Sequence, residues 1–327
     1  MANYKPASGG ISTQIDMLSR YLEKDDYKTG ILSLKGNVGH RVMSVLKLFK
    51  IGRKYDVFHI HACSDWGFLP AVIGITIGKL FKKKIVLTFH GGNGERFFDK
   101  HPNLVKSFLN KTDCNIVPSG FLEKVFAKYS LPCVVVSNII EVHTAIYHKR
   151  NRISPKFISI RSFTPTYNIL CTIKAFKQVK DSYPEATLTL LGDGPLRMEL
   201  ESYVASESIK DISFVGLVPN DQIYKYLNEA DIMLSSPLVD NMPISLLEGF
   251  DAGLLVVSSN VGGVPYIVED GQNGLLFESD NEQQMAEKIL WALNNETAAL
   301  KIMQHANQSV RKYTWESIGK QMKEIYG

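Results

Sequence analysis

Short apolar runs alternate with longer amphipathic stretches along most of this chain. The runs have the length and composition of buried strands, and the stretches between them repeat apolar residues at helical spacing. Such alternation predicts parallel sheets that are covered by helices on both faces, so we expect an α/β fold. The alternating segments are 30–34, 42–49, 57–61, 68–81, 85–90, 114–117, 121–129 and 134–137, followed by 157–160, 169–179, 187–191, 196–204, 212–215 and 223–227.

The pattern divides into two series. Residues 139–156 lose periodicity and gather charge, and we therefore interpret them as an interdomain linker. A chain of 327 residues is long enough for two domains that each bury a core of their own. Beyond residue 277 the chain is expected to be helical, over 281–293 and 297–311 and again at its end.

Composition narrows the class of protein. The chain is 45% hydrophobic and 21% charged, as soluble globular proteins are, and its formal charge of +4 is too mild to indicate nucleic acid. Its four cysteines are scattered, so neither a disulfide framework nor a zinc site is indicated, and a cytoplasmic location fits. The first ten residues lack the apolar core of a signal peptide.

The stretch 231–265 holds the most promising chemistry. It predicts a strand at 232–235, a polar loop, a helix from Pro243 to Gly253 and a second strand at 254–258. The first amides of a helix have no internal partners and would welcome an anion such as a diphosphate. Asp240 and Glu248 bracket this helix start. Since a carboxylate would repel a bound diphosphate, we expect both to reach sugar or ribose hydroxyls instead.

Four other features are candidates for function. Gly9 and Gly10 open a helix whose free amides suit phosphate or sugar oxygens, although an ordinary turn is the alternative. His90 ends a strand at the edge where open sheets bind ligands. His59 and His61 share a face of another strand, where packing or capping is the role expected of His59. The basic runs 42–54 and 79–84 fit either solvated helix faces or contact with an anionic membrane.

The sequence DNMPISLLE, from Asp240 to Glu248, resembles the E-x7-E signature of retaining GT-B glycosyltransferases, especially family 4. Residues 251–277 resemble the stretch that follows this signature. The resemblance implies two Rossmann-like, doubly wound domains facing across a cleft. It places the acceptor-side domain at 1–145 with a returning helix at 312–327, and the nucleotide-sugar domain at 146–311.

The implied reaction is hexosyl transfer (EC 2.4) from a nucleotide sugar, with a UDP-sugar preferred, and with retention at the anomeric carbon. The acceptor would be a glycan or lipid-linked molecule in cell-envelope polysaccharide synthesis. No metal or other cofactor and no nucleic acid is expected. The protein would be cytoplasmic, with peripheral contact to the inner face of the membrane.

The resemblance also assigns roles to individual residues. Asp240 and His90 would contact the donor sugar, Glu248 the ribose and Arg161 the diphosphate. Further donor contacts are expected from Gly9, Gly10, Gly216, Leu217, Asn241, Met242, Pro243, Ile244 and Ser245.

The chain departs from the family pattern at several positions. Asp240 stands in place of a glutamate, Thr166 in place of a lysine, and Tyr266 in place of another glutamate. The residues before Gly9 are too few and too polar for the usual first strand, so we expect a truncated start that leaves an empty slot in the first sheet. The alternative function is an inactive or truncated GT-B protein that acts as a partner subunit.

Overall fold

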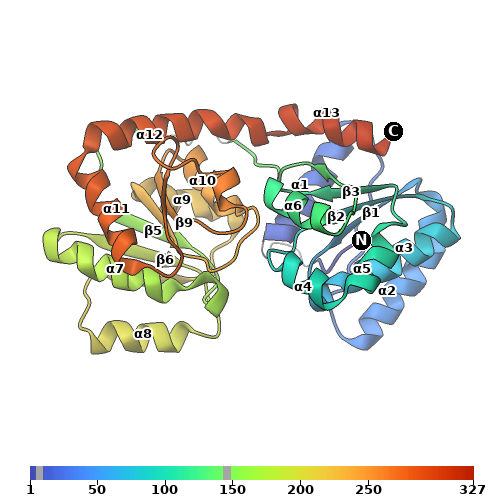
Figure 1. Ribbon diagram of the computed structural model, residues 1–327, viewed down its shortest axis with the longest axis horizontal. Coiled ribbons are helices and arrows are strands. Elements are labelled where there is room, and N and C mark those ends of the chain that lie inside the picture. The colour runs from blue at the N-terminus through green and yellow to red at the C-terminus, as the bar shows by residue number, and fades with distance from the viewer. Residues whose placement is uncertain (5–9, 143–148) are drawn as a thin grey trace. The chain divides into compact units, whose positions relative to one another are not determined.

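The computed structural model describes residues 1–4, 10–142 and 149–327. The chain forms two compact units, drawn in Figure 1. Unit 1 comprises Met1–Ile139 and Tyr313–Gly327, and unit 2 comprises Ile140–Lys312. Each unit is a parallel sheet packed by helices, which confirms the predicted α/β class with two Rossmann-like domains.

Unit 1 contains a four-stranded sheet of order β1-β2-β3-β4 in which every described pair is parallel. Its strands are β1 (Val57–Ala62), β2 (Lys84–Phe89), β3 (Cys114–Val117) and β4 (Val134–Val135). Its helices are α1 (Gly10–Lys24), α2 (Val38–Ile51), α3 (Leu69–Leu80), α4 (Gly94–Lys100), α5 (Pro102–Leu109), α6 (Gly120–Lys128) and α13 (Trp315–Tyr326).

Alternation along β2 sends side chains to both faces of this sheet. Ile85, Leu87 and Phe89 pack with residues of α3 to α6, whereas Val86 packs with α1 and α13. The C-terminal helix therefore belongs to the core of unit 1 because its apolar face, which includes Ile318, covers the second face of that sheet.

The space beside β1 is occupied by the start of the chain. The Met1 amine donates to the carbonyl of His59 at 2.5 Å, and the His61 amide donates to the Met1 carbonyl at 2.9 Å. On the other side, Ala2 exchanges backbone hydrogen bonds with Leu32 and Leu34 at 3.1 and 2.8 Å. The slot that we expected beside β1 is therefore not entirely empty, since these two residues fill part of it.

Unit 2 contains a six-stranded sheet of order β10-β9-β8-β5-β6-β7, also parallel. Its strands are β5 (Lys156–Ile160), β6 (Thr187–Leu191), β7 (Ile212–Gly216), β8 (Ile232–Ser235), β9 (Leu255–Ser259) and β10 (Leu275–Phe277). Its helices are α7 (Ile169–Ser182), α8 (Arg197–Ser206), α9 (Ile223–Glu229), α10 (Ile244–Asp251), α11 (Glu282–Asn294) and α12 (Glu296–Ser309).

The strand order of unit 2 reverses between β5 and β8, the place where open α/β sheets bind ligands. Helices α7 and α11 pack side by side over a core that includes Phe157, Phe176 and Ile289 (Figure 1). Within the described ranges, no helix is long and apolar enough to cross a membrane.

A few elements differ from the sequence prediction. Helix α10 begins at Ile244, because Pro243 has extended backbone (φ −70°, ψ 112°) and caps the helix. Segment 30–34 makes only an isolated bridge, between Ala2 and Ser33. Helices α4 and α5, of seven and eight residues, were not predicted.

Candidate functional site

Arg161 lies at the switch point of the unit 2 sheet. It follows β5, and its Nε and Nη2 donate to the Oγ of Ser235, the last residue of β8, at 3.3 and 3.2 Å. Its Nη2 also lies 3.2 Å from the Oδ2 of Asp240, and the guanidinium stacks 5.2 Å from the centre of the Tyr167 ring. The Arg161 side chain is 9% exposed, so its cation is held by protein groups on several sides.

Two glycine turns support the backbone of this ion pair. Gly192 has φ +140°, and a Cβ there would lie 1.9 Å from the Arg161 carbonyl oxygen. Gly262 has φ +51°, and a Cβ there would lie 2.0 Å from the Asp240 carbonyl oxygen, which accepts a hydrogen bond from the amide of Gly263. Larger residues at either glycine would therefore displace the charged residue opposite.

The segment between Asp240 and α10 is held tightly. The Asn241 amide donates to the Oδ1 of Asp240 at 2.8 Å, and Asn241, Met242 and Pro243 are buried. The Asn241 amide therefore already has an acceptor. Ile244 and Ser245 are half-buried and begin the helix, so the first helical amides lie directly after this segment.

Glu248 lies one turn further along α10 and is half-buried. Burial raises the pKa of its carboxyl to about 7, with Arg161 acting in the opposite direction and Asp251 adding to the rise. The field of Arg161 thus reaches both Asp240 and Glu248, which places the three predicted residues in one electrostatic neighbourhood. At neutral pH the Glu248 carboxyl is close to half ionised.

Gly216 and Leu217 lie at the end of β7. Gly216 has φ +89°, and its carbonyl accepts a hydrogen bond from the amide of Gly192 at 2.8 Å. Leu217 is 80% exposed. The Gly192 turn consequently connects this strand end with Arg161 along the same edge of the sheet. Lys174 of α7 lies 3.5 Å from Glu282 of α11, so its charge is paired within the helical layer.

The predicted residues of unit 1 form a cluster of histidines. The Nδ1 of His61 lies 3.0 Å from the Nε2 of His90, and the rings of His59 and His61 stack with centroids 4.3 Å apart. His59 is further hydrogen bonded at both ring nitrogens, to Thr88 and to Tyr326, at 2.7 Å each. Burial lowers the pKa of His90 to about 4 and of His59 to about 3, so both are neutral at pH 7.

A cavity of about 30 Å³, large enough for a water molecule, lies among these histidines. Gln14 also lines it, and its side chain donates to the Ile139 carbonyl and accepts from the Ile139 amide. Gln14 was not predicted as a site residue. A polar residue on the apolar face shared by Ile11, Ile15 and Leu18 was the signal available in the sequence.

Gly9 lies outside the described residues, and Gly10 is the exposed first residue of α1. Within residues 1–4, 10–142 and 149–327, no group of three or more His, Cys, Asp or Glu could hold a metal ion.

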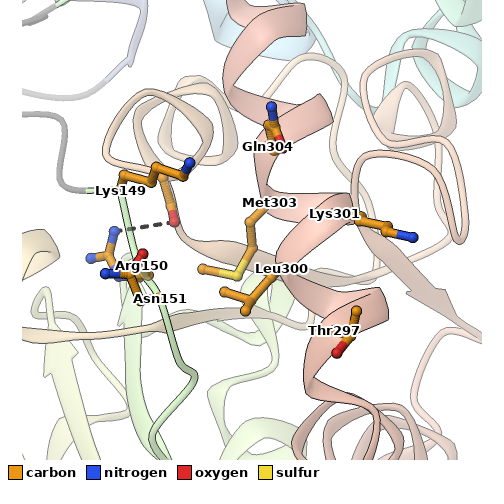
Figure 2. Close-up of a pocket in the computed structure, with 9 residues that line it drawn as sticks. Lys149, Arg150, Asn151, Thr297, Leu300, Lys301, Met303 and Gln304 are labelled. Atoms are coloured by element: carbon orange, nitrogen blue, oxygen red, sulfur yellow. Dashed lines mark hydrogen bonds between the residues drawn. The ribbon is translucent and has the colours of Figure 1, made fainter.

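A larger pocket of about 280 Å³ lies elsewhere in unit 2, between residues 149–151 and α12 (Figure 2). Arg150 lies at its wall, donating to the carbonyls of Ala252 and Gly253 at 2.6 and 3.1 Å and pairing with Asp231 at 2.8 Å. Because these contacts tie together the ends of α9 and α10, we assign Arg150 a structural role. None of the predicted site residues lines this pocket.

Family models match both parts of the chain. Residues 146–312 match the glycosyl transferases group 1 model, and residues 8–144 match the glycosyltransferase family 4 model. The chain therefore belongs to the group 1 glycosyl transferases, and its fold is of the GT-B type. As a member of this family it is a glycosyltransferase.

Individual relatives are distant. An uncharacterized glycosyltransferase of Methanocaldococcus jannaschii is 22% identical, over 99% of this chain and 95% of that protein. The amylovoran biosynthesis glycosyltransferase AmsK of Erwinia amylovora is 27% identical, over 47% of this chain and 40% of that protein. The crystal structure of Anabaena HepE in complex with UDP superposes with a TM-score of 0.77 at 16% identity, covering 98% of this chain and 97% of that one.

Proposed function

We propose that the Arg161 site of unit 2 binds a nucleotide sugar, preferably a UDP-sugar, and that the chain transfers the sugar with retention. The observation that carries this proposal is the position of Arg161, beside a helix start at the switch point of a parallel sheet. The UDP in the HepE structure supports the choice of base. The acceptor we propose is a glycan or lipid-linked molecule of the cell envelope, in keeping with the amylovoran role in the name of one relative.

Each group of the site has a part in this proposal. A guanidinium can bind two phosphate oxygens at once, and the Ile244 and Ser245 amides add the positive end of the α10 dipole. When the donor binds, its diphosphate would replace Asp240 as the anionic partner of Arg161. Asp240 would be released to accept hydrogen bonds from the donor sugar, and Glu248 would accept them from the ribose hydroxyls. The end of β7, at Gly216 and Leu217, would contact the base.

The reaction itself requires no protein nucleophile. The acceptor oxygen bonds to the anomeric carbon on the face from which the diphosphate leaves, and the leaving phosphate oxygen takes the acceptor's proton. Arg161 and the helix amides stabilise the charge that develops on the diphosphate. We propose that these groups take the place of a metal ion.

Calorimetric titration of the protein with UDP, GDP, ADP and their glucose conjugates tests the donor assignment. We expect binding of the UDP compounds, and clearly weaker binding by Glu248→Gln but not by Glu229→Gln, an exposed glutamate at the end of α9. Absence of binding to every nucleotide by the folded protein would instead favour the inactive partner subunit. Proton NMR of the product then reports whether the anomeric configuration is retained.

A further inference from the structure

Helix α2 of unit 1 exposes an apolar stripe to the surface. Val38, Val42, Leu46 and Phe49 follow one another at spacings of four, four and three residues, which puts them on one side of the helix. They are 75%, 53%, 56% and 41% exposed, and the adjacent Met43 is 65% exposed. Single exposed apolar residues are ordinary, but five on one short helix form a contiguous patch of the kind that marks an interaction surface.

The opposite side of α2 already has a partner. Leu48 is buried in a cluster with Leu32, Phe58 and Ile77, and Val45 packs against the same cluster. The helix is thus anchored to unit 1 by one face, and its exposed stripe is a second apolar face. Residues in that stripe contribute little to the core and are free to serve contact with something outside the unit.

The charged residues in the stretch that carries the stripe are all basic. From Lys35 to Lys54 the sequence contains no aspartate or glutamate. Lys47, Lys50 and Lys54 are exposed. Lys47 and Lys50 are three residues apart on α2, beside the apolar stripe, and Lys54 lies in the 3-10 turn that follows the helix.

The end of α3 extends the patch. Phe49 packs edge-on against Phe81 at 5.5 Å, and the Arg53 guanidinium lies 5.1 Å from the centre of the same ring. Next to Phe81 lie Leu80, which is 64% exposed, and the exposed Lys82. The apolar and basic residues of α2 therefore continue onto a second element, and we call the whole surface the α2 face.

We propose that the α2 face docks on an anionic lipid bilayer. A helix lying in the plane of the interface would bury Val38, Val42 and Leu46 at the boundary of headgroups and acyl chains while its lysines meet lipid phosphates. A second copy of the chain fits less well, because a self-contact of this face would bring lysines against lysines. Docking on lipid does not depend on the proposed donor site.

Co-sedimentation with lipid vesicles tests the proposal. We expect the full chain to bind vesicles of equal parts phosphatidylglycerol and phosphatidylcholine, to bind phosphatidylcholine vesicles far less, and to dissociate as salt is raised. Combined Lys47→Gln, Lys50→Gln and Lys54→Gln substitutions should lower the partition coefficient roughly 100-fold. Val42→Ser with Leu46→Ser should lower it about tenfold, through lost apolar burial.

Matched controls come from unit 2. Lys210→Gln, Lys225→Gln and Lys301→Gln remove the same charge from exposed positions, and Met198→Ser removes an apolar side chain that is 80% exposed. Both control variants should bind vesicles like the unmodified chain, and thermal melting should show that all variants are folded. Three outcomes would overturn the proposal. They are equal binding of the unmodified chain to neutral and anionic vesicles, undiminished binding by the α2 variants, and no binding to either kind of vesicle. Self-association lost in the Val42→Ser, Leu46→Ser variant without vesicle binding would assign the face to a second copy.

Discussion

Unit 1 places two histidines along β1 and a third just after β2, whereas unit 2 places an arginine and carboxylates around the ends of β5 and β8. The histidines are kept neutral by burial and bond to one another and to hydroxyl groups. The unit 2 site keeps a buried cation that is balanced by the Asp240 carboxylate, which we propose is replaced by the donor diphosphate. The same sheet edge is therefore suited to uncharged hydroxyls in unit 1 and to an anionic ligand in unit 2.

Among the tests of this comparison, substitution of Arg161 should have the largest effect on activity. Arg161→Ala should lower kcat/KM for the donor by about 10²- to 10³-fold, because the leaving diphosphate loses its main cation. Arg161→Lys should recover only part of this loss, since an ammonium cannot bind two phosphate oxygens in one plane. Steady-state kinetics with a UDP-sugar measures both, and Arg152→Ala, an exposed arginine of unit 2, is the control. Unchanged kinetics in Arg161→Ala would remove the arginine from the site.

Alanine substitutions at two glycines distinguish the cost of backbone strain from the effect of displacing Asp240. Gly262→Ala should cost about 3 kcal/mol of stability and weaken donor binding, because its Cβ would meet the Asp240 carbonyl 2.0 Å away. Gly271 also has positive φ, +72°, but no atom lies within 4 Å of its added Cβ, so Gly271→Ala should cost only about 1 kcal/mol. Urea unfolding and calorimetry measure the two effects. Equal costs for the two variants would show that contact with Asp240 is unimportant.

The two units should also respond to pH in opposite directions. The folded-state pKa of His90 is about 4, below its ordinary value of 6.5, so stability gained by keeping it neutral is present above pH 6.5 and is lost as the pH falls toward 4. The folded-state pKa of Glu248 is about 7, above its ordinary value of 4.5, so unit 2 gains stability as the pH falls from 7 toward 4.5.

Amide hydrogen exchange, corrected for its intrinsic pH dependence, resolves the units separately. Between pH 6.5 and 4.5 we expect peptides of β1 and β2 to lose protection, with about 2 kcal/mol of the loss due to His90, so that the loss should shrink by about that amount in His90→Asn. Peptides of α10 should gain protection, except in Glu248→Gln. A parallel response of both units would contradict the opposed pKa shifts.

The smallest predicted effect is the change of donor affinity with pH. If the ionised Glu248 carboxyl accepts from the ribose hydroxyls, affinity for a UDP-sugar should rise up to about tenfold between pH 6 and pH 8, following ionisation around pH 7. Calorimetry at several pH values measures this rise. Glu248→Gln should bind weakly and show a flat profile, and a pH dependence that survives in that variant must come from another group.

Much of the fold could be predicted from the sequence because its apolar runs are long and regular. The bounds of β3, β6 and β8 agree with the predicted segments to the residue. Shorter elements are harder to predict. Strand β10 was missed because its three residues are too few to show a periodic pattern. The place of Met1 beside β1 could not be predicted, because it depends on backbone hydrogen bonds rather than on side chains.

The candidate site was predictable in part. Spacing and resemblance singled out Arg161, Asp240 and Glu248, but nothing in the sequence indicated that Arg161 pairs with Asp240 or rests on Tyr167 and Ser235. These contacts join residues far apart in the chain. In the same way the sequence placed His90 at a strand end, whereas its bond to His61 required the register of β1 on β2. The contact of His90 with a donor sugar stays a prediction.

Amide hydrogen exchange of the chain with and without a saturating UDP-sugar would locate the donor directly. We predict new protection in the peptides that cover 161–167, 214–217 and 240–248, and little change in the peptides that line the α12 pocket. Protection confined to that pocket or to the histidine cluster of unit 1, with 240–248 unaffected, would contradict the assignment of the donor site to Arg161, Asp240 and Glu248.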